Sequence, residues 1–73
     1  MSIAIIQVKE PLTEEKINMI ESRLSQTNGI ERALIDVKTG SIRVEYDGLK
    51  IVPELMMEAL SKHGLESEEL QNV

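Results

Sequence analysis

Two short segments, 33–37 and 42–46, place apolar residues at every second position on either side of Lys38-Thr39-Gly40-Ser41. The alternating residues are Ala33, Ile35 and Val37 in the first segment and Ile42, Val44 and Tyr46 in the second. Two runs with a period of two around a glycine-containing turn predict a β-hairpin with one face on a hydrophobic core.

The residues before the hairpin predict a strand and a helix. Residues 3–8 are apolar on both faces, which is typical of a central strand. Thr13 is the expected N-cap of a helix that runs to about Ser25, because the threonine side chain can accept a hydrogen bond from the first turn. The apolar stripe of this helix is expected to hold Ile17, Ile20 and Leu24. Asn28-Gly29, just beyond it, can end a helix, because glycine tolerates the left-handed conformation that a helix C-terminus commonly needs.

The residues after the hairpin predict a second helix and a last strand. Pro53 fits the first helical turn, where a missing N–H is tolerated, and His63-Gly64 fits the end. The predicted apolar stripe consists of Leu55, Met56, Ala59 and Leu60. Residues 65–70 can supply an edge strand whose glutamates discourage pairing with other chains.

The predicted order of elements is therefore β-α-β-β-α-β. Right-handed crossovers place the first and third strands in the centre, so the expected fold is an α+β, ferredoxin-like sandwich. Its four-stranded sheet has the order 4-1-3-2, with both helices on one face. Residues 1–73 are expected to form a single domain.

Composition narrows the functional classes. The chain is 41% hydrophobic and 29% charged, as expected for a globular protein. A net charge of −5 and a single aromatic residue argue against nucleic acid and anionic membranes as partners. Because no apolar run reaches the ~18–20 residues of a membrane span and no signal peptide is visible, a cytoplasmic location is expected.

The chain lacks cysteine and known catalytic motifs, which excludes several kinds of site. The chain has no cysteine, which removes disulfides, thiolate metal sites and thiol nucleophiles. It also has no Ser-His-Asp order, glycine-rich phosphate loop or metalloprotease motif, and its acidic residues fall on predicted exposed faces. We therefore expect no enzymatic activity and no cofactor.

One family pattern spans nearly the whole chain. The residues that carry it are Gly29-Ile30, Ala33, Ile35-Asp36, Gly40, Val44, Tyr46-Asp47 and Gly64-Leu65, together with Ile20-Glu21 and Leu24 in the first predicted helix. In these residues the chain resembles the heavy-metal-associated (HMA) domain, a family that includes copper chaperones and N-terminal modules of metal-pumping P-type ATPases. The resemblance implies a ferredoxin-like fold and a role linked to metal transport.

The chain departs from this family at the metal-binding loop. Members carry Gly-Met-Thr-Cys-x-x-Cys before the first helix, and the two thiolates bind a soft cation such as Cu(I). Counting back from Ile20, the two cysteine positions are occupied here by Thr13 and Lys16. A hydroxyl and an ammonium cannot replace two thiolates, so the metal site is predicted to be degenerate.

Other side chains offer only weak metal candidates. His63 is a lone histidine expected near the family's metal loop, where Glu14, Glu10 or Glu15 could join it, although a histidine at a helix end is more often a capping residue. Met56-Met57 is better explained by core packing, because adjacent helical side chains point about 100° apart.

Three functional classes therefore stay open. The first is an HMA-like protein-interaction or accessory module without metal. The second is a metal-transport accessory that binds metal weakly through non-cysteine ligands, and the third is an ACT-like small-molecule sensor.

The candidate contact surface is the open face of the sheet. Ile3, Ile5 and Leu34 are predicted to form its apolar centre, which would be used for self-association or for another protein, such as a metal transporter. The predicted charged rim consists of Arg32, Arg43, Glu45 and Asp36.

Overall fold

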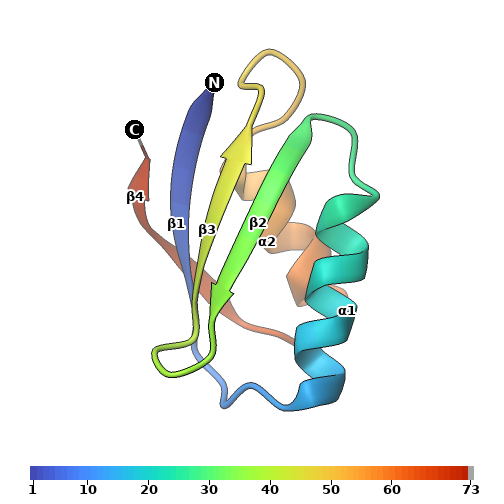
Figure 1. Cartoon of the computed structure of the whole chain (residues 1–73), viewed down its shortest axis with the longest axis vertical. Helices are drawn as coiled ribbons and strands as arrows, with labels where there is room; N and C mark the ends of the chain where they lie inside the picture. Colours follow the sequence, from blue (N-terminus) through green and yellow to red (C-terminus); the bar gives the residue numbers. More distant parts are fainter. Residues whose placement is uncertain (73) are drawn as a thin grey trace.

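The computed structural model describes residues 1–72 and confirms the predicted ferredoxin-like fold. Four antiparallel strands form one sheet in the order β2-β3-β1-β4, which is the predicted order, and both helices pack on the same face (Figure 1). The elements are β1 (Ser2–Val8), α1 (Glu14–Ser25), β2 (Ile30–Asp36), β3 (Ser41–Tyr46), α2 (Pro53–Ser61) and β4 (Ser67–Asn72).

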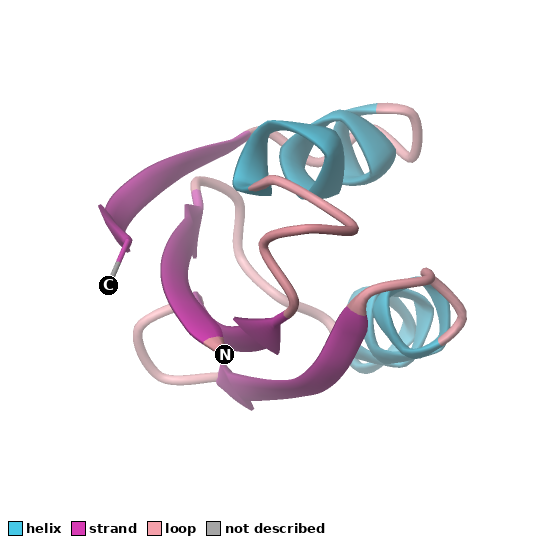
Figure 2. Cartoon of the chain, turned by 90° about the horizontal axis from the view of Figure 1, so that it is seen from above, coloured by secondary structure: helices cyan, strands magenta, loops and turns pink. Residues whose placement is uncertain are grey.

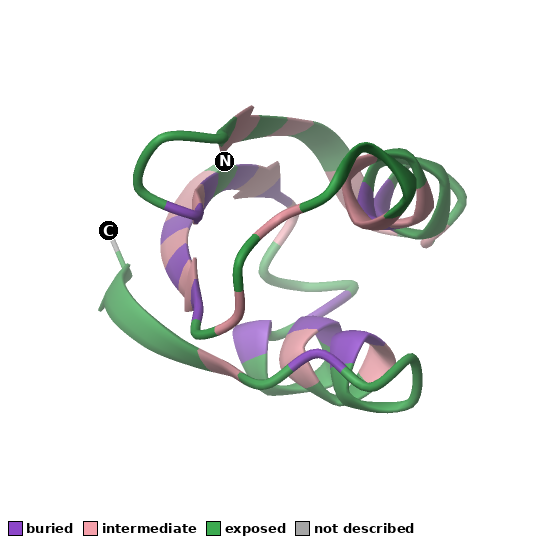
Figure 3. Cartoon of the chain, turned by 90° about the horizontal axis from the view of Figure 1, so that it is seen from below, coloured by how far each residue is buried: buried purple, intermediate pink, exposed green. Residues whose placement is uncertain are grey.

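The central strands β1 and β3 form the floor of the core. Ala4 lies opposite Val44 and Ile6 lies opposite Ile42, and all four are fully buried. Figure 2 shows the curvature of the sheet, and Figure 3 shows that buried residues line the sides on which sheet and helices face one another. The other buried core residues are Val8, Ile20, Leu24, Tyr46, Ile51, Met56, Leu60 and Leu65.

The hairpin is as predicted, except at Val37. Strand β2 ends at Asp36, whose carbonyl accepts a hydrogen bond from the Gly40 N–H at 2.8 Å. This bond closes the turn one residue earlier than the alternation suggested. Val37 therefore belongs to the turn and is 58% exposed, so the prediction that it faces the core is wrong.

Helix α1 begins and ends where predicted, but Gly29 does not form its end. Thr13 is the N-cap, and the helix ends at Ser25 with Gln26 in a right-handed conformation. Gly29 does have a positive φ of 99°, but it lies in the turn that leads into β2. A Cβ atom on Gly29 would come within 2.8 Å of the Lys50 Cβ atom, so close approach to that loop, rather than a helix end, requires glycine here.

Helix α2 turns a somewhat different face toward the core than the sequence predicted. Met56 and Leu60 are buried as predicted, but Leu55 is 52% exposed and Ala59 only half-buried. Neighbouring helical side chains diverge by about 100°, so a short helix that buries Met56 turns Leu55 outward. The helix also ends at Ser61, before the predicted His63-Gly64.

The last strand begins later than predicted. Leu65 lies in the loop before β4, where its N–H donates a hydrogen bond to the Leu60 carbonyl. Its side chain packs into the core and is 1% exposed. Strand β4 then continues to Asn72, whose side-chain oxygen accepts a 2.7 Å hydrogen bond from the buried Tyr46 hydroxyl. Within residues 1–72, no helix has the length and apolar character needed to cross a membrane.

Candidate functional site

The loop between β1 and α1 lies at the end of the molecule where three segments meet. It covers residues 9–13 and leads into the first turn of α1, at the lower end of Figure 1. The Lys9 N–H donates to the Glu66 carbonyl at 2.9 Å, and the Val8 N–H donates to the Gly40 carbonyl at 2.9 Å. The start of β4 and the hairpin turn therefore hold the first part of the loop in place.

Thr13 and Lys16, the two positions at which the family pattern has cysteine, both have structural roles. The Thr13 Oγ1 atom accepts a 3.2 Å hydrogen bond from the Lys16 backbone N–H and so caps the helix. The Lys16 side chain turns back over the loop. Its Nζ atom lies 3.8 Å from the Glu10 Oε2 atom and 3.5 Å from the Pro11 carbonyl oxygen.

Glu10 joins this contact to the far end of the sequence. Its second carboxylate oxygen, Oε1, accepts a 2.6 Å hydrogen bond from the Glu66 backbone N–H. One carboxylate therefore connects the Lys16 ammonium on α1 with the segment that enters β4. Sequence reasoning missed this link, because Glu10 and Glu66 are 56 residues apart and share no periodic pattern.

The chemistry of this loop does not fit a soft metal ion. The available groups are a hydroxyl used as a helix cap, a carboxylate used by two donors, and a backbone carbonyl. Cu(I) is selected by thiolate and thioether ligands, and an ammonium group repels a cation. Among residues 1–72, no three His, Cys, Asp or Glu side chains lie close enough together to hold a metal.

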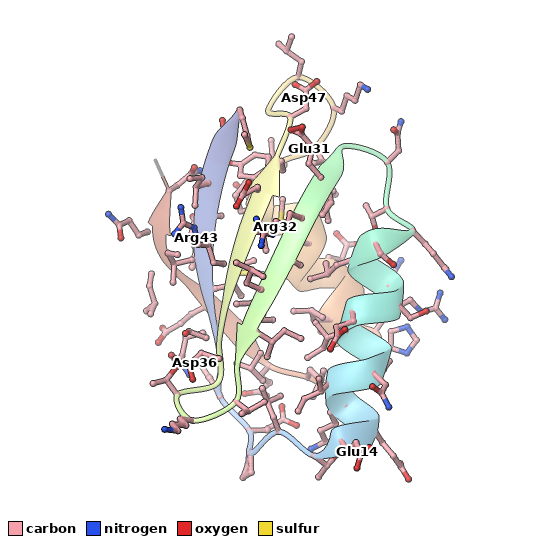
Figure 4. The ribbon with its side chains drawn as sticks, viewed as in Figure 1. Glu14, Glu31, Arg32, Asp36, Arg43 and Asp47 are labelled. Atoms are coloured by element: carbon pink, nitrogen blue, oxygen red, sulfur yellow. The ribbon has the colours of Figure 1, made fainter. Side chains whose placement is uncertain are left out.

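The structure does not bring the two weak metal candidates together. Glu14 lies in the first turn of α1, at the lower end of the helix in Figure 4. His63 instead lines a groove with Arg23 and Thr27 at the other end of that helix. Arg23 is nine residues beyond Glu14, or about 13 Å along a helix. The expectation that His63 lies beside the metal loop is therefore wrong.

The two methionines that could suggest thioether ligands pack as hydrophobic residues. Met56 is 1% exposed within the core, and Met57 is a partly buried residue packed against it. This matches the predicted core-packing role.

The open face of the sheet holds the predicted contact residues, but not as one apolar patch. Ile3 and Ile5 are half-buried, and Leu34 is 44% exposed. Arg43, expected in the charged rim, is paired with Ile5 on one side and Leu34 on the other. Figure 4 shows Arg43 and Arg32 over the middle of this face. The strand register places Arg43 at the centre, where it separates the apolar side chains.

Comparison with known proteins gives a consistent set of relatives. The copper chaperone CopZ of Staphylococcus epidermidis is 34% identical over 64 residues, which cover 88% of this chain and 94% of that protein. CopZ of Staphylococcus haemolyticus is 32% identical over 60 residues, which cover 82% of this chain and 88% of that protein. No family model matches the chain.

Solved structures show the same fold. A copper binding domain from HMA7, a P-type ATPase, superposes with a TM-score of 0.90 at 22% identity and covers 99% of this chain and 97% of its own. A chain in the solution structure of the Atx1-Cu(I)-Ccc2a complex has a TM-score of 0.86 at 21% identity, with 97% of both chains covered. At these identities, the likeness establishes the fold alone.

Proposed function

This chain belongs to the family of CopZ copper chaperones and heavy-metal-associated domains, and we propose that it is a non-catalytic accessory module of metal transport that no longer carries the metal. In this role it binds another protein, and a domain of a metal transporter is the first candidate. The complex that joins Atx1, Cu(I) and Ccc2a supports this choice of partner, because it contains a chain of the same fold.

The position of Lys16 is the observation that supports the proposal most strongly. Its ammonium group occupies one of the two cysteine positions and lies 3.8 Å from the Glu10 carboxylate. A positive charge at this place disfavours a metal cation, and it also balances a carboxylate that would otherwise stand alone in the loop.

The remaining contacts of the loop support a module that works without metal. Thr13 caps α1, and Glu10 joins Lys16 to the start of β4. These bonds fix the loop between the same elements that flank the metal loop in the family pattern. A partner therefore meets an ordered surface at this end of the molecule, whether or not metal is present.

The open face of the sheet is the second contact surface in this proposal. It presents Ile3, Ile5 and Leu34 around Arg43, and it serves either a second copy of the chain or another protein. The loop and the open face lie on different sides of the molecule, so substitutions can separate their contributions.

Metal titration tests the proposed loss of the site. Cu(I) is added to the protein in the presence of a competing chelator, and we expect no stoichiometric complex tighter than about micromolar. A tight site on the wild-type chain would contradict the proposal and restore a carrier function.

Partner binding is tested separately with the metal withheld. The N-terminal domain of a copper-transporting P-type ATPase is titrated into isotope-labelled protein with chelator present, and amide shifts are followed by NMR. Shifts at residues 9–16 or on the open face support the module. Binding that requires added Cu(I) would contradict it.

A further inference from the structure

Helix α2 has apolar side chains on two of its sides. Met56 and Leu60 face the core, whereas Val52, Leu55 and Ala59 recur at the spacing of a second helical stripe. Val52 is 46% exposed and Leu55 is 52% exposed. The core does not use this second stripe, which makes it available to another molecule.

The second stripe borders a groove between the two helices. Figures 1 and 2 show α1 and α2 on the same side of the sheet. The groove between them has a volume of about 410 Å³. Its wall on α2 includes Leu55 and Ala59, and its wall at the C-terminal end of α1 includes Arg23 and Thr27.

The charge of the groove is opposite to that of the chain. Arg23 and Lys62 border it together with Glu58, which lies 3.8 Å from the Lys62 Nζ atom. Arg23 has no ion pair with any side chain of residues 1–72. The groove therefore has an excess positive charge on a protein whose net charge is −5.

We propose that this groove binds an amphipathic helix of a partner protein, with apolar residues on one stripe and carboxylates beside it. Leu55 and Ala59 on the α2 wall can contact such a stripe, and the free Arg23 guanidinium can pair with a flanking carboxylate. The inference goes beyond the proposed function, because it concerns a surface at the other end of α1 from Lys16.

A second copy of the chain does not fit this description. The exposed apolar stripe that α2 of a second copy could offer is Val52, Leu55 and Ala59, and this stripe is itself part of the groove that it would have to fill. That stripe is bordered by Lys62 as well as by Glu54 and Glu58, so it lacks the uniformly acidic border that would suit Arg23. The charge pattern thus favours an acidic partner helix over self-association.

Two synthetic peptides of about 15 residues, long enough to form a helix on binding, provide the test. Both have leucines at the spacing of one helical stripe, and their remaining polar positions are glutamate in one peptide and lysine in the other. Each is titrated into isotope-labelled wild-type protein. We expect the glutamate peptide to shift the amides of Thr27, Leu55, Ala59 and His63 with a Kd below about 1 mM, and the lysine peptide to bind at least about tenfold more weakly.

Matched variants locate the contact. Leu55→Ser and Arg23→Glu alter exposed positions, so both should fold, and each should weaken binding of the glutamate peptide by about tenfold. Arg23→Glu should also reduce the preference for the glutamate peptide. Leu70→Ser is the control, because it removes a similarly exposed leucine from strand β4, away from the groove, and should leave the affinity unchanged.

Several results would overturn the proposal. These are the absence of saturable shifts up to about 1 mM peptide, equal affinity for the two peptides, or an equal loss of affinity in Leu70→Ser. A wild-type dimer that Leu55→Ser dissociates would also overturn it, since the groove would then be filled by a second copy.

Discussion

The two halves of α1 match the family pattern to different degrees. In the first turn, Thr13 and Lys16 replace both cysteines and are at least partly exposed. In the second half, Ile20 and Leu24 keep the apolar positions of the pattern and are completely buried. One helix thus combines a changed chemical site with an unchanged packing surface, which indicates that the fold does not depend on the metal ligands.

The magnitudes of the interactions explain this difference. Removing a buried aliphatic side chain from a small core costs about 2–4 kcal/mol, a large part of a stability of about 5–15 kcal/mol. An exposed ion pair contributes about 0–1 kcal/mol. The Lys16 and Glu10 side chains are 36% and 33% exposed, so their ion pair is expected to contribute no more than an exposed pair does. A substitution in the loop is therefore expected to cost much less stability than one in the core.

The largest expected effect is the return of a metal site to the first turn. Thr13→Cys combined with Lys16→Cys places two thiolates at the family spacing and removes the ammonium charge. We expect Cu(I) affinity to rise from weaker than about micromolar to tighter than about nanomolar, measured by chelator competition.

Thr13→Ser combined with Lys16→Gln is the matched control, since it removes the charge without adding a sulfur ligand. It should bind no more tightly than about micromolar. If the double-cysteine variant folds but gains no Cu(I) affinity, the geometry of the loop also differs from that of the copper chaperones, in addition to the identity of the ligands.

The second largest effect is expected in the buried half of the helix. Ile20→Ala leaves a cavity between α1 and the sheet, and we expect the free energy of unfolding to fall by about 2–4 kcal/mol. Urea denaturation followed by circular dichroism measures it. Glu21→Ala, at the exposed neighbouring position, should change stability by less than about 0.5 kcal/mol. A loss below about 1 kcal/mol for Ile20→Ala would show that the core tolerates this cavity.

The same contrast explains how much the sequence could predict. Ile20, Ile42 and Val44 were recognisable because burial imposes a period of two or of about 3.6 on apolar residues. Leu55 was wrongly assigned to the core, because two adjacent apolar positions at the start of a short helix do not determine which one faces inward. Val37 was wrongly assigned because alternation does not show at which residue a turn begins. For the loop between β1 and α1, the sequence predicted only that the two cysteine ligands of the family are missing.

The contacts within the loop between β1 and α1 have no sequence signature. The bond between Glu10 and the Glu66 N–H joins residues that only the completed fold brings together. The groove beside Arg23 likewise depends on how the two helices pack. Periodicity reports which residues are buried, but it does not report which polar side chains meet across the fold.

A smaller effect is expected from the carboxylate that closes the loop. Glu10→Gln keeps an oxygen that can accept from the Glu66 N–H but loses the charge beside Lys16, whereas Glu10→Ala loses both. We expect Glu10→Ala to lower stability by about 1 kcal/mol and Glu10→Gln by less than about 0.5 kcal/mol. Hydrogen exchange at the Glu66 amide should become faster in Glu10→Ala only. Equal exchange rates in the two variants would show that the ion pair, rather than the hydrogen bond, holds the loop.

The smallest effect concerns the open face of the sheet, where charge interrupts the apolar side chains. Arg43 separates Ile5 from Leu34, so we expect the wild-type chain to self-associate no more tightly than about 1 mM. Arg43→Leu would join these residues into one apolar patch. We expect it to strengthen self-association by up to about tenfold, because the apolar contact area increases and the Arg43 side chains of two copies no longer repel each other. Sedimentation over a range of concentrations measures both proteins, and Ile5→Lys in the Arg43→Leu background should reverse the gain. If Arg43→Leu sediments like the wild type, the open face does not support self-association, and only a heterologous partner is compatible with it.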